Sequence, residues 1–422
     1  MSETSTGRDR SRAIELTGDA TGDVSPEQFA ASFGEDLRRL LDVDTWLPGE
    51  DLHNLYGRLA DEVLDATRHE AAALRQIRQE VLPRLSGYPG APSGAGHYRA
   101  KLSDLERIHR GLLFNGGVEA CDGRPQVHDT LPLTIYQVGV CLVSYQGDQG
   151  TWGNRLFRRD LRMASGDPMA EMIDLLERRE PRGGMNQPSR HDRLSELAQR
   201  GIMSYAERAI LLRRSNAIWR MGHGSPAPYE LITGSGSLDL MIEATKVIRE
   251  LVEGHQKFVF VASQPVDRVL LTIGQALHPL EFAIVSTLKE QINATVDNGH
   301  YRMRVASDTT WDGRRLNPEE WIRTFRDVVA PRVVVGVYRA TRLAPAQVFY
   351  AHADHADVAA CIALADSVLQ EQRGFPLLID LAQTVCSGVF GRETLASPVS
   401  VAYADAGAPW QYLSERASRF GR

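Results

Sequence analysis

The spacing of apolar residues changes partway along this chain of 422 residues, and that change limits the folds open to it. From residue 26 to residue 85 apolar residues recur every three or four positions, which predicts helices, including a long charged helix at about 52–82. Residues 86–98 then bring two prolines and four glycines, and after Asn115 the pattern is that of strands. We therefore expect a disordered polar tail over residues 1–25, a helical arm over 26–85, a linker over 86–98 and one large domain over 99–422.

The expected domain begins with three strands at 117–123, 133–145 and 154–164, separated by turn residues that predict an antiparallel meander. The elements that follow alternate as in α/β units: helices at 168–179 and about 192–221, a strand at 229–233, a helix at 238–253, strands at 257–262, 331–340 and 346–352, a helix at about 356–372 and a final helix at 377–389. A meander followed by α/β crossovers in one mixed sheet is the order of an RNase H-like core. The predicted fold class is therefore α/β, RNase H-like, with an N-terminal helical arm.

The charge of the chain excludes a uniformly basic surface for nucleic acid or membrane. The sequence has 48 Lys and Arg and 54 Asp and Glu, which gives a net charge of −6. A polyanion would have to bind a local basic face. Two segments could form such a face: Arg155, Arg158, Arg159 and Arg162 in the third strand, and Arg208, Arg213, Arg214 and Arg220 in the helix at 192–221. These arginines either contact phosphate or simply form a solvated surface. No apolar run is long enough to span a membrane, and the start of the chain lacks a signal peptide, so we expect a cytoplasmic protein.

Two motifs are alternative candidates for a catalytic or metal-binding site. His352, Asp354 and His355 form the densest set of potential metal ligands, but a helix beginning near Asp354 explains that aspartate as a cap without a metal. Asp122 follows an apolar strand and precedes Gly123, so we expect its carboxylate at a sheet end where a turn opens. Divalent ions in phosphodiester hydrolysis need several converging carboxylates, so Asp122 would need partners.

The sequence around Asp122, GVEACDGRPQ with the strand after it, resembles the first motif of the NurA nuclease family. In that family an Asp-Gly-Ser at the end of the first strand supplies a metal-binding aspartate. A helix with a Glu follows, then a strand that ends in a second Asp-Gly-Ser-Leu, and finally Tyr-Pro and a helix with Ala-His. This chain offers matching segments in the same order over about residues 115–395: Glu207, Thr233-Gly234-Ser235, Phe375-Pro376 and Ala382-Gln383.

The resemblance implies a metal-dependent nuclease that processes DNA ends as a homodimer, together with a HerA-type hexameric ATPase, in DNA repair or anti-phage defence. It implies Mn²⁺ or Mg²⁺ held by Asp122 and Glu207. Three expected residues are replaced, by Thr233, Phe375 and Gln383, so the active site looks eroded. Glu230 could compensate only if a bulge turned its side chain to the other face of the expected strand, and Asp380 lies one turn before Gln383. The alternative function is a non-catalytic DNA-binding or scaffold subunit of the same kind of complex.

Overall fold

The computed structural model describes residues 25–46, 52–130, 133–147, 150, 152–160, 168–178, 194, 197–263, 267–297, 310–311, 314–315 and 317–408. Residues 1–24 of the tail expected over 1–25 lie outside the described residues, as does Arg162. The chain divides into two compact units, Met1–Ala71 and Ala72–Arg422. Among the described helices, each is too short or too polar to cross a lipid bilayer.

The first unit is helical: α1 (Pro26–Phe33), α2 (Leu37–Leu41), the short turn η1 (Val43–Thr45) and the start of α3 (Leu52–Gln76). Ser25 and Gln28 form a capping box at the start of α1, which satisfies backbone N–H groups that the first helical turn leaves unpaired. None of the described residues of this unit is buried, and Phe33, Leu41, Val43 and Trp46 are each at least two-thirds exposed. The predicted long helix is confirmed, and helical geometry continues past α3 through η3 (Ile77–Val81).

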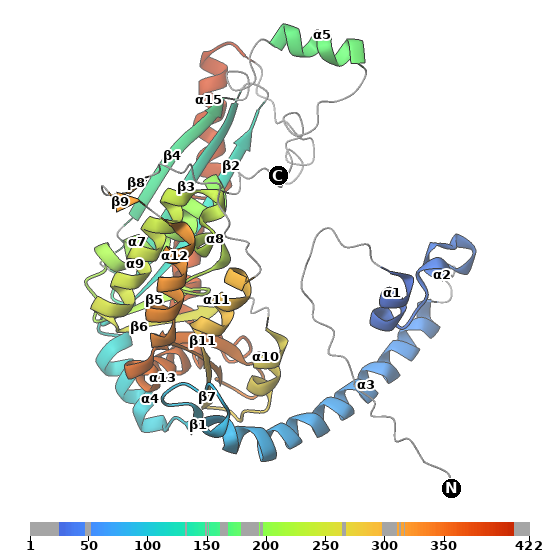
Figure 1. Ribbon diagram of the computed structural model, residues 1–422, viewed down its shortest axis with the longest axis vertical. Coiled ribbons are helices and arrows are strands. Elements are labelled where there is room, and N and C mark those ends of the chain that lie inside the picture. The colour runs from blue at the N-terminus through green and yellow to red at the C-terminus, as the bar shows by residue number, and fades with distance from the viewer. Residues whose placement is uncertain are drawn as a thin grey trace. The chain divides into compact units, whose positions relative to one another are not determined.

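The second unit contains a nine-stranded mixed sheet in the order β1-β7-β10-β11-β6-β5-β2-β3-β4 (Figure 1). The strands are β1 (Gly96–Arg99), β2 (Val118–Asp129), β3 (Leu133–Val143), β4 (Trp152–Asp160), β5 (Trp219–His223), β6 (Phe258–Ala262), β7 (Glu281–Thr287), β10 (Val333–Arg339) and β11 (Gln347–His352). Only the pairs β2–β5 and β5–β6 are parallel among these strands. A separate two-stranded ribbon joins β8 (Thr310–Trp311) to β9 (Arg314–Arg315).

Helices cover both faces of this sheet. They are α4 (Leu102–Ile108), α7 (Ile202–Arg214), α8 (Tyr229–Ile232), α9 (Leu238–Glu250), α10 (Arg268–Gln275), α11 (Leu288–Asp297), α12 (Pro318–Thr324), α13 (Ala356–Ser367), α14 (Leu377–Val389) and α15 (Arg392–Asp405). A further helix, α5 (Pro168–Arg178), contributes none of its described side chains to either apolar layer of the core. Short 3₁₀ or π turns are η4 (Leu82–Gly87), η5 (His109–Leu113), η6 (Leu197–Gly201), η7 (Gly234–Gly236), η8 (Leu251–His255), η9 (Phe325–Val329), η10 (Ala330–Arg332) and η11 (Ala353–His355).

The core has two apolar layers, one on each side of the sheet. Helices α7 and α9 to α12 pack on the face that carries Phe258 and Phe260, while α4, α13 and α14 pack on the face that carries Val259 and Val261. Strands in the middle of the sheet are therefore apolar at consecutive positions, as the fully buried β6 illustrates. This double burial explains why the sequence run at 257–262 could be predicted as a strand.

The α/β class, the mixed sheet and the antiparallel meander β2–β3–β4 are confirmed. The helix expected at 192–221 is wrong at its end, because α7 stops at Arg214 and Trp219–His223 forms β5 between β2 and β6. The strand expected at 229–233 is instead the short helix α8, since a brief apolar run does not reveal its periodicity. Residues 96–98 of the expected linker belong to β1, and α15 follows the helix that was expected to be last.

A buried ion pair fastens the segment after α3 to the sheet. The guanidinium of Arg78 donates to both carboxylate oxygens of Glu281 on β7, at 2.7 and 2.9 Å. His97 Nε2 lies 3.0 Å from the same carboxylate, and the His278 N–H donates to it at 2.7 Å. Burial alone would raise the pKa of Glu281, but these donors outweigh it and lower the pKa to about 2.

We expect Glu281→Gln to lower the free energy of unfolding by roughly 3 kcal/mol at pH 7, because it leaves Arg78 without its anionic partner. Since the folded-state pKa of Glu281 is depressed, its stabilisation is present above the unfolded-state value near 4.3 and is lost as the pH falls towards about 2. Urea unfolding across this window should show a pH dependence that the variant lacks.

Glu319→Gln is the matched control, because Glu319 forms an exposed ion pair with Arg323. It should change the unfolding free energy by less than about 1 kcal/mol. Equal effects of the two substitutions would contradict the role given to the buried pair.

Candidate functional site

A cavity of about 510 Å³ opens where β5 ends beside β2. The parallel pairing of these strands stops at Cys121 and Gly222, whereas β2 continues along β3 as far as Asp129. The cavity is lined by β2, α7, the segment after β5, α8 and α14, through Asp122, Gly123, Arg124, Pro125, Gln126, Met203, Ser204, Glu207, Arg208, His223, Gly224, Ser225, Pro228, Glu230 and Gln383. Asp122 therefore lies in the middle of a strand, and the expectation that it ends one at a turn is wrong.

The two predicted carboxylates reach this cavity from opposite faces of the sheet. Cys121 faces α7, since its thiol donates to the Glu207 carbonyl at 3.4 Å. Asp122 points to the other face, because its register partner Cys141 packs against Cys386 of α14. Gly123 makes room between them: an added Cβ would lie 2.7 Å from Glu207 Oε1.

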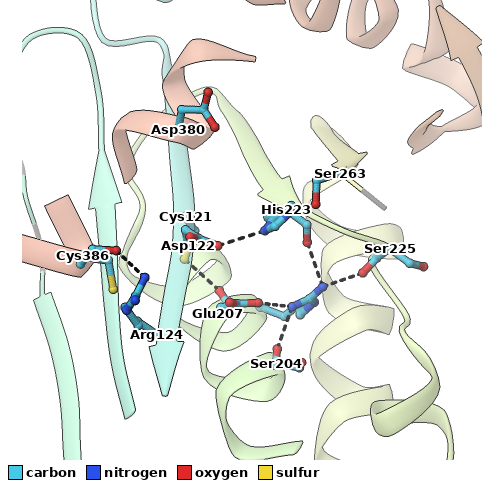
Figure 2. A network of polar contacts seen from close by, with 12 residues as sticks. Cys121, Asp122, Arg124, Ser204, Glu207, His223, Ser225, Ser263, Asp380 and Cys386 are labelled. Carbon is cyan, nitrogen blue, oxygen red and sulfur yellow. Dashed lines mark hydrogen bonds and ion pairs between the residues drawn. The ribbon is translucent and has the colours of Figure 1, made fainter. Parts of the chain in front are cut away.

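A polar network joins these carboxylates to α7 and β5 (Figure 2). His223 Nδ1 lies 3.2 Å from Asp122 Oδ1, and His223 Nε2 lies 2.6 Å from the Ser263 hydroxyl. Glu207 forms an ion pair with Arg208, whose guanidinium also donates to the carbonyls of Ser204, His223 and Ser225, at 3.1, 3.1 and 2.6 Å. Arg208 thus fixes both Glu207 and the chain segment that follows β5.

Burial determines the protonation of this network. It raises the pKa of Glu207 to about 7, with Asp122 adding to the rise and Arg208 and His223 opposing it. Burial also disfavours the charged form of His223, but the hydrogen bond to Asp122 and the charge of Glu207 outweigh it and raise the pKa of His223. The cavity therefore holds two buried carboxylates whose negative charge is only partly balanced.

No three His, Cys, Asp or Glu side chains within the described residues gather closely enough to form a metal-binding group. Carboxylate oxygens suit Mg²⁺ and Mn²⁺, however, and three carboxylates line the cavity: Asp122, Glu207 and Glu230. Glu230 lies on α8, so strand alternation does not constrain it, and it accepts a hydrogen bond from Ser204 at 2.7 Å. A cation at Glu207 would offset the cost of burying its charge, but the described carboxylates are not gathered as closely as those of a metal-binding group.

The other predicted family positions are spread around the cavity. Gln383 lines it, and the ring of Phe375 lies 6.0 Å from that of His223. Thr233 is buried after α8, outside the lining residues, and its hydroxyl donates to the Tyr229 carbonyl at 2.8 Å. Asp380 is held by Arg373 and by Gln370 Nε2 at 2.6 Å, outside the lining residues as well.

The predicted basic residues do not form one row. Arg155 and Arg159 of β4 share one face of the sheet, and Arg158 is on the other, because successive strand residues alternate. Arg213 and Arg214 are exposed at the end of α7, about two turns from Glu207. Among these five, none lines the cavity, and their contact with phosphate stays a prediction.

The histidine cluster lies at the far end of β6 from this cavity, because β11 runs antiparallel to β6. His352 Nδ1 accepts the Asp354 N–H at 3.2 Å and so caps η11, while the Asp354 side chain is 77% exposed. His355 packs edge-on against Trp219. Capping and packing account for these side chains without a metal, although the cap is His352 rather than the expected aspartate.

His223, Ser225 and Ser204 belong to the site but were missed in the sequence. His223 and Ser225 lie just beyond the run 192–221 that was predicted to be one helix, which hid the strand end that carries them. A recognisable signal was present, because an apolar strand followed by His-Gly-Ser places a polar side chain at a strand terminus.

No protein-family model and no curated protein matches the sequence. Among solved structures, the NurA nuclease from Sulfolobus solfataricus is similar with 10% identity and a TM-score of 0.43, covering 84% of this chain and 99% of that one. A structure of NurA bound to dAMP and manganese is similar with 9% identity and a TM-score of 0.38, covering 80% and 93%. A structure of NurA with manganese is similar with 9% identity and a TM-score of 0.34, covering 68% and 92%.

We expect Gly123→Ala to displace the Glu207 carboxylate, because the new methyl group would also lie 2.9 Å from Glu207 Cγ and 3.0 Å from Met203 Cγ. The free energy of unfolding should fall by about 1–3 kcal/mol, the usual cost of overpacking. Urea unfolding measures this loss, and a crystal structure of the variant would show the new position of Glu207.

Gly388→Ala is the control, since Gly388 lies in α14 with nothing within 4 Å of the added Cβ. Helix propensity predicts no loss there and up to about 1 kcal/mol of gain. A Gly123 variant as stable as the unsubstituted chain, with Glu207 in place, would be inconsistent with the packing described.

Proposed function

We propose that this chain is a metal-dependent phosphodiester hydrolase that acts on DNA, of the NurA-like kind that its sequence motifs resemble. The observation that carries the proposal is the convergence of Asp122, Glu207 and His223 on one cavity from three segments far apart in the sequence. Several carboxylates that line one cavity are what the divalent cations of phosphodiester hydrolysis need. Asp122 and Glu207 would hold Mn²⁺ or Mg²⁺.

The topology around the cavity supports the same proposal. The strand order β4-β3-β2-β5-β6 is an antiparallel meander extended by two parallel strands, which is the arrangement expected for an RNase H-like core. Asp122 lies on the first strand of the meander, and His223 ends the first parallel strand beside it. Ligands of α/β sheets commonly bind at the carboxyl ends of parallel strands.

His223-Gly224-Ser225, rather than Thr233-Gly234-Ser235, then stands where the family has its second Asp-Gly-Ser, because β5 is the strand that precedes it. A histidine at this position can offer an imidazole nitrogen in place of a carboxylate oxygen. It also removes one negative charge from the site. This chain would therefore depart from the family by having a histidine in place of an aspartate ligand. It departs also at the closing motif, where it has Phe375 and Gln383.

Each side chain of the site has a defined part in this proposal. A bound divalent cation would supply neutralisation of phosphate charge and acidification of a water. Asp122 and Glu207 would hold that cation, and Arg208 holds Glu207 in place through their ion pair. Ser263, at 2.6 Å from Nε2, fixes the ring of His223.

The wider assembly belongs to the proposal on the strength of the motif resemblance alone. It comprises a cytoplasmic homodimer that receives DNA from a HerA-type hexameric ATPase, in DNA repair or anti-phage defence.

The second candidate is a non-catalytic DNA-binding or scaffold subunit of the same kind of complex. Its favouring observations are the guanidinium of Arg208, which already pairs with Glu207, and Gln383, which cannot exchange a proton near neutral pH as a histidine can. This candidate predicts no cleavage with any divalent ion, alone or with the ATPase.

Cleavage of linear DNA with Mn²⁺ tests the leading candidate. Asp122→Asn and Glu207→Gln keep the shape of each side chain and should each lower the rate by at least about 100-fold, because each removes a charge that positions the metal. Glu243→Gln, on the exposed side of α9, is the control and should leave the rate unchanged. Robust metal-dependent cleavage that survives Asp122→Asn would sink the site assignment.

We further expect His223→Asp to tighten Mn²⁺ binding about tenfold or more in isothermal titration calorimetry, since an added carboxylate beside Asp122 raises the negative charge of the donor set. His69→Asp, on the exposed surface of α3, should leave the affinity unchanged. Weaker Mn²⁺ binding by the His223 variant would contradict the equivalence of His223 and the family's aspartate.

A further inference from the structure

Arg124 shares a strand and a cavity with the candidate metal ligand Asp122. It lies two residues further along β2, so both side chains project to the same face of the sheet, about 6.8 Å apart along the strand. Both line the cavity. Helix α14 holds the guanidinium of Arg124 on this face, because Arg124 Nη1 donates to the Ser387 hydroxyl at 2.8 Å.

The two arginines of the cavity differ in how their charge is balanced. Arg208 is paired with Glu207 and donates to three backbone carbonyls. Arg124 makes no ion pair with a carboxylate of the described residues, whereas the Nε of each arginine is buried without a hydrogen-bond acceptor there. A guanidinium that lines a cavity without an anionic partner is suited to an anionic ligand.

The missing ligand should be an anion with more than one oxygen. A guanidinium presents Nε and an Nη in a planar fork that matches two oxygens of a phosphate. A cavity of about 510 Å³ is within the size range of small-molecule sites and accommodates one nucleotide. The carboxylates of Asp122 and Glu207 in the same cavity repel free anions, so the phosphate should arrive as part of a larger molecule that brings other contacts.

We propose that Arg124 binds the non-bridging oxygens of a DNA phosphate in this cavity, beside the carboxylates that hold the metal. This inference rests on the proposed function and deepens it by naming the residue that recognises the DNA backbone. Arg124 is a substrate-binding residue, and its contact with phosphate does not depend on the base sequence.

Binding of a fluorescein-labelled single-stranded oligonucleotide to the full chain in EDTA tests this directly, because metal-dependent cleavage does not proceed there. Arg124→Ala should weaken binding about 10–100-fold, as expected for loss of charged hydrogen bonds. The slope of log affinity against log salt concentration should fall by about 0.7, the contribution of one phosphate contact to a single strand. Arg124→Lys should keep that slope while losing part of the affinity, because it keeps the charge and not the fork.

Two matched variants separate recognition from folding. Ser387→Ala removes the anchor on α14 but keeps the arginine charge, so the salt slope should stay unchanged. Arg323→Ala, an exposed residue of α12, should change neither affinity nor slope. If Ser387→Ala reproduced the full effect of Arg124→Ala, the arginine would act through packing and the proposal would be overturned.

The outcomes distinguish this inference from the function on which it rests. Unchanged affinity and salt slope in Arg124→Ala, together with cleavage that depends on Asp122, would overturn the arginine assignment alone. A chain that neither binds nor cuts DNA would overturn both.

Discussion

The buried guanidinium of Arg208 is the interaction on which the site depends. Taking a carboxylate such as Glu207 out of water is costly unless an opposite charge and hydrogen bonds replace the lost solvation. Arg208 provides that charge and at the same time binds the carbonyls of Ser204, His223 and Ser225. One side chain therefore couples the position of α7 to the end of β5, and the geometry of the cavity follows from it.

The unequal lengths of β2 and β5 leave an opening at this edge of their pairing. Because β5 ends beside the middle of β2, side chains from both faces can meet at the exposed half of β2, and Gly123 leaves the space for Glu207 to do so. In a sheet of equal strands, Asp122 and Glu207 would be separated by the backbone layer. The long strands of the meander thus have a functional consequence: they carry β2 past its shorter neighbour (Figure 1).

The sequence predicted those parts of the fold whose burial pattern is strong and local. The meander, β6, α9 and α14 all have long or consecutive apolar patterns, and they appear where expected. The five residues of β5 carry too short a pattern, and their strand pairing depends on β2 and β6, which are distant in sequence. Asp122 and Glu207 were found through motif order and do share a cavity. The turn expected at Gly123 and the strand expected at 229–233 were wrong, because Gly123 lies within β2 and Tyr229–Ile232 forms α8.

The buried carboxylates Glu281 and Glu207 differ in how well neighbouring groups balance their charge. Glu281 is surrounded by donors from Arg78, His97 and His278, and they lower its pKa to about 2, which is what a stabilising ion pair does. Glu207 has a pKa raised to about 7, lines an open cavity and shares it with Arg124, which makes no ion pair with a carboxylate of the described residues. A scaffold gains nothing from such an arrangement, since apolar residues of similar volume often stabilise a core as well or better. Ionisable groups whose pKa is shifted by burial and that line a cavity are instead typical of functional sites.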